Sequence, residues 1–160
     1  MDNNRSHKIL VWNIRGLNSQ GKWDALRAKI TESACNIICL QETKRDNFDP
    51  TYLRKFCPRH LDGFAFSPSA GASGGLLTIW NSNLYSGDIV QTNSYTVTLK
   101  FTYLLDQSSF HLSNIYGPAH STGKMVFVTW LLNFDGSTFE DWILAYQRCK
   151  CSTMLFLIWT

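Results

Sequence analysis

Three polar positions in this sequence each follow an apolar segment that has the composition of a buried strand. Asn13 follows KILVW, Gln41 and Glu42 follow NIICL, and the segment 114–116, which ends in Tyr116, follows FHLS. In α/β proteins the carboxyl ends of neighbouring strands meet at one edge of a sheet, and ligands bind at that edge. A carboxylate there is a candidate ligand for Mg²⁺, which commonly takes one or two protein carboxylates and keeps waters for a phosphate group.

Each of these positions also has a purely structural explanation. Glu42 fits a solvated residue at the end of a strand. Asn13 fits a residue that stabilises the turn before Gly16, and Tyr116 fits a core aromatic residue whose hydroxyl reaches the surface. A single position therefore does not predict a catalytic site. Only the combination of the three indicates one.

Two strands and a helix must position the first two of these side chains. The apolar, branched segments Lys8–Ile14 and Asn36–Leu40 are typical of buried strands. Between them lie apolar residues at the i, i+3 and i+7 spacing of one helical face, namely Trp23, Leu26 and Ile30. A strand–helix–strand unit of this kind is a right-handed crossover, and it implies a layered α/β domain.

The middle of the chain differs, because glycine, serine and asparagine turns separate short strand-like segments. Asp49 is expected to cap a short helix over Pro50–Phe56, with proline at the first helical position. In the strand expected at Tyr95–Tyr103, polar and apolar residues alternate, which predicts one side facing solvent and one buried side. The other strands are expected at Phe64–Phe66, Leu76–Trp80, Asp88–Gln91, Phe110–Ile115 and Trp142–Leu144, and a helix at Ser121–Phe134.

The composition places few limits on the type of partner. The 160 residues carry 15 basic and 12 acidic side chains, a net charge of +3, which is too small to predict binding to nucleic acid. The N-terminus, MDNNRSHK, lacks the apolar stretch of a secretory signal. The longest apolar run, Met154–Trp159, is far shorter than the about 20 residues of a membrane span. These features favour an intracellular protein without a membrane segment, and no obligate protein partner is evident.

The five cysteines are expected to be reduced thiols, because their number is odd and the chain begins without a secretory signal. An alternative is a zinc site formed by Cys149 and Cys151 together with Cys57 or a histidine. Their spacing matches no common zinc motif. Reduced thiols are therefore the simpler interpretation.

Several motifs together resemble the endonuclease/exonuclease/phosphatase superfamily. VWNIRGL at 11–17, CLQETK at 39–44 and NIYGP at 114–118 are similar, in order and approximate spacing, to the first motifs of that superfamily. SGGLLTIW at 73–80 looks like the glycine-bearing strand between them, and the resemblance covers about residues 8–145. Longer stretches, WNIRGLNSQGKWDAL and NIYGPAHSTGK, resemble the N-terminal endonuclease domain of plant non-LTR (LINE-type) retroelement polyproteins. Apurinic/apyrimidinic endonucleases are the next relatives.

The resemblance implies a fold, a reaction and a role for each of the three polar residues. The implied fold is a four-layer α/β sandwich of mixed α/β class, and the implied reaction is the metal-dependent hydrolysis of DNA phosphodiester bonds. Glu42 would ligate the catalytic Mg²⁺ and Asn13 would help to hold that site. Tyr116 would lie beside the scissile phosphate, where it would stabilise charge or orient the nucleophile. DNA would be the partner, and a nuclear location rests on the resemblance only.

The sequence departs from the family pattern after Leu144. The pattern has a Gly-Asp-x-Asn motif there, whereas this chain reads AYQRC over 145–149. No aspartate or glutamate follows Asp141 in the sequence, so the later Asp-His pair of the family, a general base and its orienting partner, is also missing from it. Loss of a general base alone typically lowers a rate by about 10² to 10⁴. We therefore expect this chain to have no useful nuclease activity.

Two smaller departures concern the polar residues around the expected site. Arg15 stands where apurinic-type relatives often have an acidic residue, and Ala119 stands where many relatives have asparagine. An arginine cannot ligate a metal, although its guanidinium can contact a phosphate. Arg15 mainly argues against an abasic-site repair enzyme.

Residues 8–145 are accordingly expected to form the N-terminal portion of the domain, which is incomplete in its C-terminal half. A flexible N-terminus (1–7) would precede it, and a tail that does not resemble the family (146–160) would follow it. Two other functions stay open. The first is a non-catalytic remnant that at most binds nucleic acid weakly. The second is a polyphosphate or lipid-headgroup phosphatase, which is disfavoured because it needs the same absent motifs.

Overall fold

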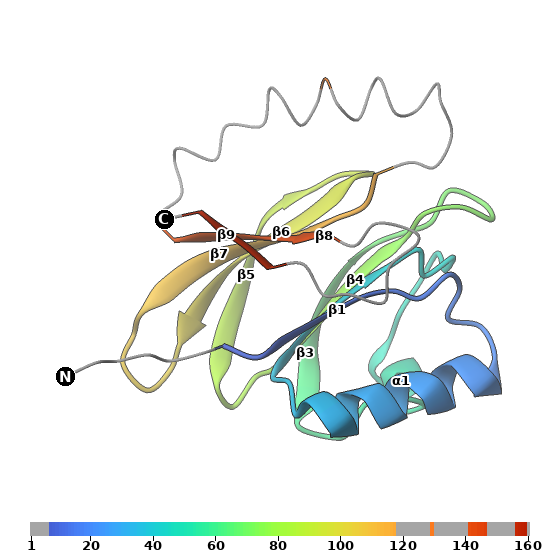
Figure 1. The fold of residues 1–160 in the computed structure, drawn as a ribbon, viewed down its shortest axis with the longest axis horizontal. Coiled ribbons are helices and arrows are strands. Elements are labelled where there is room, and N and C mark those ends of the chain that lie inside the picture. Colours follow the sequence, from blue (N-terminus) through green and yellow to red (C-terminus); the bar gives the residue numbers. More distant parts are fainter. Residues whose placement is uncertain (1–6, 118–128, 130–140, 147–155, 160) are drawn as a thin grey trace.

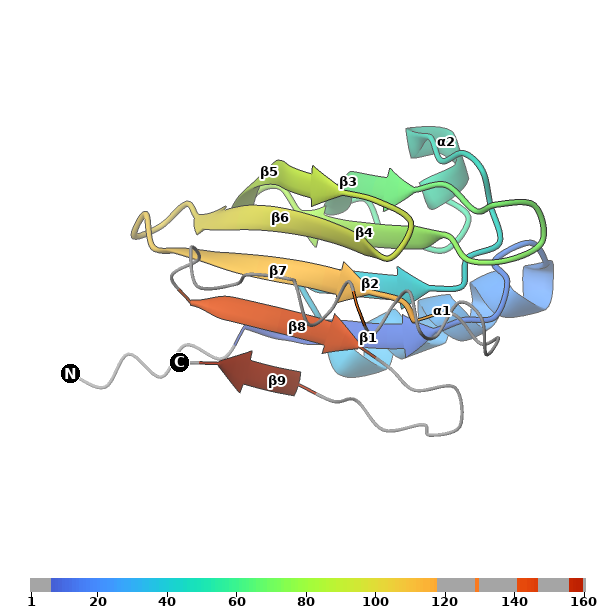
Figure 2. The ribbon, with the colours of Figure 1, turned by 90° about the horizontal axis from the view of Figure 1, so that it is seen from above.

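Two β-sheets lie face to face in the computed structural model, which describes residues 7–117, 129, 141–146 and 156–159 (Figure 1). The first sheet has the strand order β1-β2-β4-β3 and the second has the order β5-β6-β7-β8-β9, as Figure 2 shows from above. The first sheet consists of β1 (Ile9–Asn13), β2 (Ile37–Gln41), β3 (Leu61–Ser67) and β4 (Leu76–Asn81). The second consists of β5 (Tyr85–Thr92), β6 (Thr96–Tyr103), β7 (Ser109–Ile115), β8 (Trp142–Tyr146) and β9 (Phe156–Trp159).

The expected strand–helix–strand unit is present at the start of the chain. β1 and β2 pair in parallel, and helix α1 (Gln20–Ser33) connects them along the outer face of the first sheet (Figure 1). Leu26 and Ile30 are buried, and Trp23 packs against the same cluster, so the predicted helical face is confirmed. Ala34 caps the helix: its N–H donates to the carbonyl of Ile30, and its left-handed φ of 48° turns the chain out of the helix.

Apolar side chains cover both faces of the first sheet. On one face, alternate strand residues pack with α1 and the segment after it in one core cluster; on the other, they pack against the second sheet. Leu10 and Leu40 belong to the first cluster, while Val11 and Cys39 belong to the second. Burial on both faces explains why β1 and β2 read as continuous apolar runs instead of alternating ones.

Strand β6 corrects one prediction. The side formed by Thr96, Thr98, Lys100 and Thr102 was expected to face solvent. The first two threonines are fully buried, Thr102 is half-buried, and the lysine is exposed. The hydroxyl of Thr98 lies 2.7 Å from that of Ser113 on β7, which also accepts a hydrogen bond from Trp142 Nε1 at 2.9 Å. β6 is an inner strand of its sheet. The Thr98 hydroxyl therefore finds a partner on β7, and the Thr96 hydroxyl lies 3.4 Å from that of Thr98 on the same strand. The alternation of polar and apolar residues therefore indicated which side of the strand is polar, but not whether that side is exposed to solvent.

The short helix after β2 begins where it was expected and ends earlier. In α2 (Pro50–Leu53) the carboxylate of Asp49 accepts a hydrogen bond from Tyr52 N–H at 2.9 Å, which confirms the predicted cap. The helix was expected to reach Phe56, but that residue instead donates its N–H to the carbonyl of Leu53, three positions back. The last turn is thus tighter than an α-helix.

The C-terminal part of the chain adds two strands to the second sheet. β8 is two residues longer than expected and pairs in parallel with β7, and β9 pairs with β8 in antiparallel orientation. β9 lies within the segment expected to be a tail unlike the family. The helix expected over Ser121–Phe134 falls, apart from Thr129, outside the described residues, and so do residues 1–6 and 147–155.

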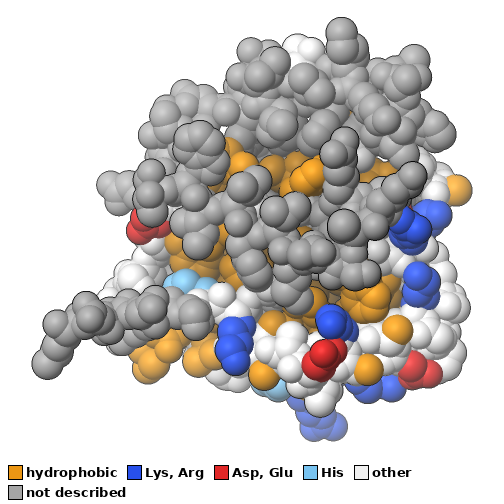
Figure 3. All heavy atoms as spheres, viewed as in Figure 1, with side chains coloured by type: hydrophobic (Ala, Val, Ile, Leu, Met, Phe, Trp, Pro, Cys, Tyr) orange, Lys and Arg blue, Asp and Glu red, His pale blue; other side chains and the backbone are white. Residues whose placement is uncertain are grey.

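On the face that Figure 3 shows, lysine and arginine side chains lie in the lower and right-hand parts of the molecule, with acidic side chains among them. Within the part of the chain that the structure describes, no helix is long and apolar enough to cross a bilayer.

Candidate functional site

The carboxyl ends of β1, β2 and β7 meet at one end of the two sheets, and they bring the predicted residues together. The phenol of Tyr116, just after β7, donates a hydrogen bond to Oε1 of Glu42, just after β2, over 2.8 Å. Asn13 ends β1 in register with Gln41, so it lies at the same edge of the first sheet. Glu42, Tyr116 and Asn13 are all half-buried.

The backbone around Glu42 is turned away from the strand. Glu42 has a φ of 54°, a left-handed conformation that is uncommon for residues other than glycine. The carbonyl of Glu42 accepts a hydrogen bond from Gly16 N–H at 2.7 Å, and that of Thr43 accepts one from Leu17 N–H at 3.0 Å. The segment after β1 therefore holds the segment after β2 in place, which sustains the unfavourable φ at Glu42.

The glycine pair before β4 holds the other side of the same segment. The N–H groups of Thr43 and Lys44 donate to the carbonyls of Gly75 and Gly74 at 3.1 and 3.0 Å. Both glycines have positive φ, and a Cβ built on Gly75 would lie only 2.4 Å from Oγ1 of Thr43. A side chain at Gly75 is thus incompatible with the observed path of the backbone beside Glu42.

A pocket of about 360 Å³ opens beside the Tyr116–Glu42 hydrogen bond. Both residues line it, together with the amine-bearing Lys44 and a second tyrosine, Tyr95. Asn13 does not belong to its lining. The small residues of the loop before β4 and its neighbours complete the wall: Pro68, Ala70, Ala72, Ser73, Gly74, Gly75 and Ser94. The sequence analysis assigned no role to Tyr95 or Lys44, although Lys44 ends the CLQETK segment that carries the family resemblance.

Donor atoms for a metal ion are few at this end of the sheets. Among the residues described, no three histidine, cysteine, aspartate or glutamate side chains gather in a way that could hold a metal ion. Glu42 provides one carboxylate and Asn13 one amide oxygen. A carboxylate and an amide oxygen are ligand types that a hydrated Mg²⁺ accepts, since it takes one or two carboxylates and retains several waters. This donor set does not fit a closed zinc site.

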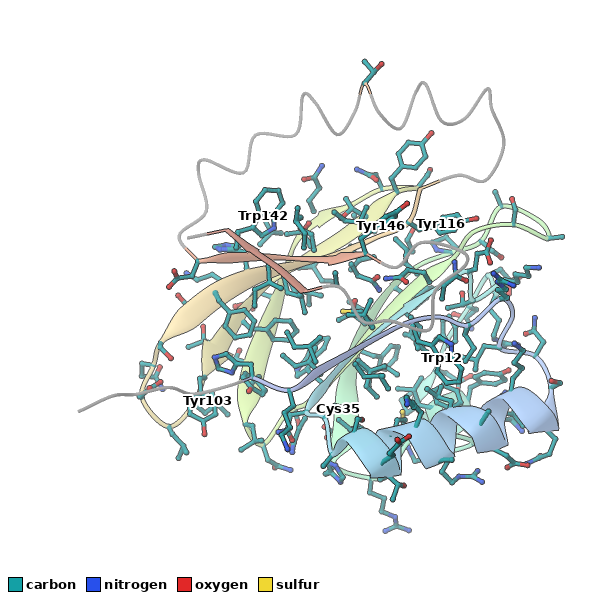
Figure 4. All side chains as sticks on the ribbon, viewed as in Figure 1. Trp12, Cys35, Tyr103, Tyr116, Trp142 and Tyr146 are labelled. Carbon is teal, nitrogen blue, oxygen red and sulfur yellow. The ribbon has the colours of Figure 1, made fainter. Side chains whose placement is uncertain are left out.

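Tyr146 belongs to the AYQRC segment, which stands where the family pattern has its Gly-Asp-x-Asn motif. It ends β8 in register with Ile115, the residue before Tyr116, so it also lies at this end of the sheets (Figure 4). Arg15 precedes Gly16 and has a left-handed φ of 52°. Ala119 and the residues after Tyr146 that depart from the family pattern fall outside the described part of the chain.

The buried thiols have no part in the chemistry of this site. Cys35, Cys39 and Cys57 are buried and free. Burial raises the pKa of the Cys57 thiol to about 12 and that of Cys39 still further. Such groups stay protonated near neutral pH, so they do not provide a thiolate nucleophile. Cys149 and Cys151 of the alternative zinc site lie outside the described residues.

No protein-family model matches the sequence, and no match was found among the curated proteins. Solved structures do match. The catalytic domain of APE2 from Xenopus laevis has a TM-score of 0.65 and 18% identity, over 86% of this chain and 56% of that one. The AP endonuclease LMAP from Leishmania major has a TM-score of 0.59 and 19% identity, over 91% of this chain and 56% of that one.

A third match is the catalytic domain of human Nocturnin with bound sulfate, which has a TM-score of 0.51 and 12% identity, over 86% of this chain and 62% of that one. The chain thus spans less than two thirds of each of these solved chains. At such identities the likeness concerns the fold. The chain has the mixed α/β, two-sheet fold of the endonuclease/exonuclease/phosphatase type.

Proposed function

We propose that this chain is part of a magnesium-dependent phosphodiesterase domain that descends from a LINE-type retroelement endonuclease and acts on DNA. The observation that carries the proposal is the 2.8 Å hydrogen bond between Tyr116 and Glu42, two residues 74 positions apart. The proposal is supported by the sequence motifs, which include both residues, and by the pocket that both residues line. Two of the structural neighbours are named as an AP endonuclease and as APE2, which supports a nucleic-acid substrate.

In the proposed reaction an in-line water hydrolyses a phosphodiester bond. Glu42 and Asn13 would hold Mg²⁺, which supplies polarisation of the phosphate and neutralisation of the leaving oxygen. The phenol of Tyr116 would stand beside the scissile phosphate, because its hydrogen bond to Glu42 fixes the position of its oxygen. Lys44, on the wall of the same pocket, would offer a positive charge to a phosphate oxygen.

We further propose that these 160 residues alone do not hydrolyse DNA at a useful rate. The sequence contains no acidic residue after Asp141 to activate the water or to complete the metal site. The missing base and the missing metal-positioning groups would each lower the rate by orders of magnitude, without simple additivity. A remnant that binds nucleic acid weakly is the second candidate. The small net charge of +3 gives that binding little electrostatic support.

A plasmid-nicking assay with Mg²⁺ tests the catalytic part of the proposal. The chain and its Glu42→Ala variant are compared at equal concentration with a buffer control. We expect both proteins to leave the supercoiled plasmid intact. Nicking by the chain that is absent from the Glu42→Ala variant would show that the residues present suffice for catalysis, and the proposed inactivity would be wrong.

Metal binding is tested without reference to activity. Mn²⁺, a paramagnetic substitute for Mg²⁺, is titrated against the chain and followed by electron paramagnetic resonance. We expect one weak site that is lost in Glu42→Gln. The matched control is Glu32→Gln, since Glu32 is an exposed residue of α1 paired with Lys29. Equal Mn²⁺ binding by both variants and the unaltered chain would contradict the assignment of Glu42 as a ligand.

A further inference from the structure

A pair of buried amides lies beneath the Tyr116–Glu42 hydrogen bond and joins the two sheets. Asn114 of β7 and Gln41 of β2 are both fully buried, and Nε2 of Gln41 donates to Oδ1 of Asn114 over 2.9 Å. The same Nε2 lies 3.3 Å from the carbonyl of Ala145 on β8. The Gln41 side chain thus reaches from the first sheet to two strands of the second.

Asn114 makes the reciprocal connection. Its Nδ2 donates to the carbonyls of Leu40 and Leu77, each over 3.2 Å, and lies 3.3 Å from Oγ1 of Thr78. These three acceptors lie on β2 and β4 of the first sheet, although Asn114 belongs to the second. Because Nδ2 faces the carbonyl oxygens of Leu40 and Leu77, which can only accept, the orientation of the amide is determined, and its oxygen is left to accept from Gln41.

The amide pair is adjacent in sequence to both residues of the candidate site. Gln41 immediately precedes Glu42, and Asn114 is two positions before Tyr116. Asn114 and Tyr116 both reach toward the first sheet, where they hydrogen-bond to Gln41 and Glu42. Only one or two backbone units separate each amide from the site residue beside it. A shift of either amide would therefore change the distance between Tyr116 and Glu42.

The pair is poorly explained as a device for stability. Gln41 Oε1 is buried and, within the described residues, has no hydrogen-bond partner, and the same holds for Oγ1 of the neighbouring Thr43. Apolar side chains in these places would avoid leaving polar atoms unpaired between the sheets. Local violations of this kind are typical of residues that serve a functional site.

We propose that Gln41 and Asn114 are positioning residues, which lock the carboxyl ends of β2 and β7 at the separation that Glu42 and Tyr116 need. This proposal rests on the proposed function, because that function requires Tyr116 and Glu42 to be held together. Neither amide touches the pocket, and both act through the residues that line it. They hold the two halves of the site in place although the halves belong to different sheets.

The test compares Gln41→Met, Asn114→Leu and the double variant in the full chain, with two measurements. The first is stability, from urea unfolding. The second is the ¹³Cζ NMR signal of Tyr116, which is assigned with Tyr116→Phe and reports the hydrogen bond to Glu42. Mn²⁺ affinity is recorded as well, since loss of groups that orient a metal ligand weakens binding by about 10- to 100-fold.

We expect each single variant to lower stability and to displace the Tyr116 signal toward that of Glu42→Ala. The double variant should recover part of the stability, because no amide is left facing a lost partner. Its Tyr116 signal should stay displaced and its Mn²⁺ affinity should stay about tenfold below that of the unaltered chain. Recovery of stability together with the original Tyr116 signal would overturn the proposal, because the pair would then be a structural contact only.

Thr98→Val is the matched control, because it breaks another buried polar pair of the second sheet, with Ser113. It should lower stability and leave the Tyr116 signal in place. An equal displacement of that signal in Thr98→Val would refute a specific role for the amides. If Asn114→Leu does not fold, Gln41→Met alone decides the question, because it leaves the three bonds from Asn114 Nδ2 intact.

A wrong metal site and a wrong positioning role for the amides would give different experimental results. If the unaltered chain binds no Mn²⁺ through Glu42, the proposed metal site is wrong, while the Tyr116 signal still tests the amide pair. If Mn²⁺ binds through Glu42 and both amide substitutions leave the Tyr116 signal unchanged, the metal site is supported and the positioning role is wrong.

Discussion

Tyr116 donates its phenolic hydrogen to Oε1 of Glu42 across the junction of the two sheets, over 2.8 Å. Glu42 follows a strand of the first sheet and Tyr116 a strand of the second. The bond therefore depends on how the sheets dock as well as on the two side chains. The proposed role of Tyr116 depends on this contact.

The Tyr116–Glu42 bond should appear as a coupling energy. A hydrogen bond to a charged group contributes about 1.5–3 kcal/mol when buried, and partial exposure of both groups reduces this to about 1 kcal/mol. We expect a double-mutant cycle of Tyr116→Phe and Glu42→Ala, followed by urea unfolding, to give that coupling. The same cycle with Tyr103→Phe, at the other end of β6, should be additive within about 0.5 kcal/mol.

Gly75→Ala should strongly destabilise the segment beside the site. Its φ of 89° is unfavourable for alanine, and the added Cβ would meet Thr43 Oγ1 at 2.4 Å. We expect a loss of about 2 kcal/mol or more in the free energy of unfolding. Gly71→Ala is the control: its φ is 61°, but nothing lies within 4 Å of the new Cβ, so only the backbone cost of about 1 kcal/mol is expected. Equal losses would argue against the close contact at Thr43.

Ser113→Ala should lower stability, because it removes one of the buried hydroxyls of the second sheet. Ser113 Oγ pairs with Thr98 Oγ1 and accepts from Trp142 Nε1, so its removal takes a partner from two groups at once. The expected cost is about 1–3 kcal/mol in thermal or urea unfolding. Ser109→Ala, at an exposed position of the same strand, should change stability by less than about 0.5 kcal/mol. Similar effects of the two variants would contradict the buried arrangement.

Stability should fall in alkali because of the buried thiols. An unfolded thiol loses its proton near pH 8.5, whereas burial raises the pKa of Cys57 to about 12 and that of Cys39 further. Above about pH 9 the folded state therefore binds more protons than the unfolded state, and the free energy of unfolding decreases by about 1.4 kcal/mol per pH unit for each thiol. Below about pH 8 both states keep these protons, and the thiols cause no pH dependence.

Urea unfolding between pH 9 and 10 measures this slope. The range ends there because burial also raises the pKa of Tyr85, whose titration would contribute in stronger alkali. Cys57→Ala should make the slope shallower by about 1.4 kcal/mol per pH unit. An unchanged slope would mean that the Cys57 thiol titrates normally in the folded chain.

Local features of the fold were predictable, because they depend on neighbours in sequence. The apolar runs around Asn13 and Glu42 indicated strands, and the spacing of Leu26 and Ile30 indicated a helical face. The cap at Asp49 depends on a contact three residues away. The prediction that one side of β6 faces solvent was wrong, because the burial of that side depends on hydroxyl partners such as Ser113 that are distant in sequence.

The candidate site shows the same division. Residue types and order alone marked Glu42, Asn13 and Tyr116, but they left the pocket wall at Tyr95 and the partner of Gln41 unknown. These contacts form only when two sheets from distant segments pack together, and no local pattern records that packing. The sequence by itself indicated which groups are candidates for the site and at which strand ends they stand. The tertiary structure alone decided that Glu42 and Tyr116 meet, since the distance between them is set by the docking of one sheet on the other.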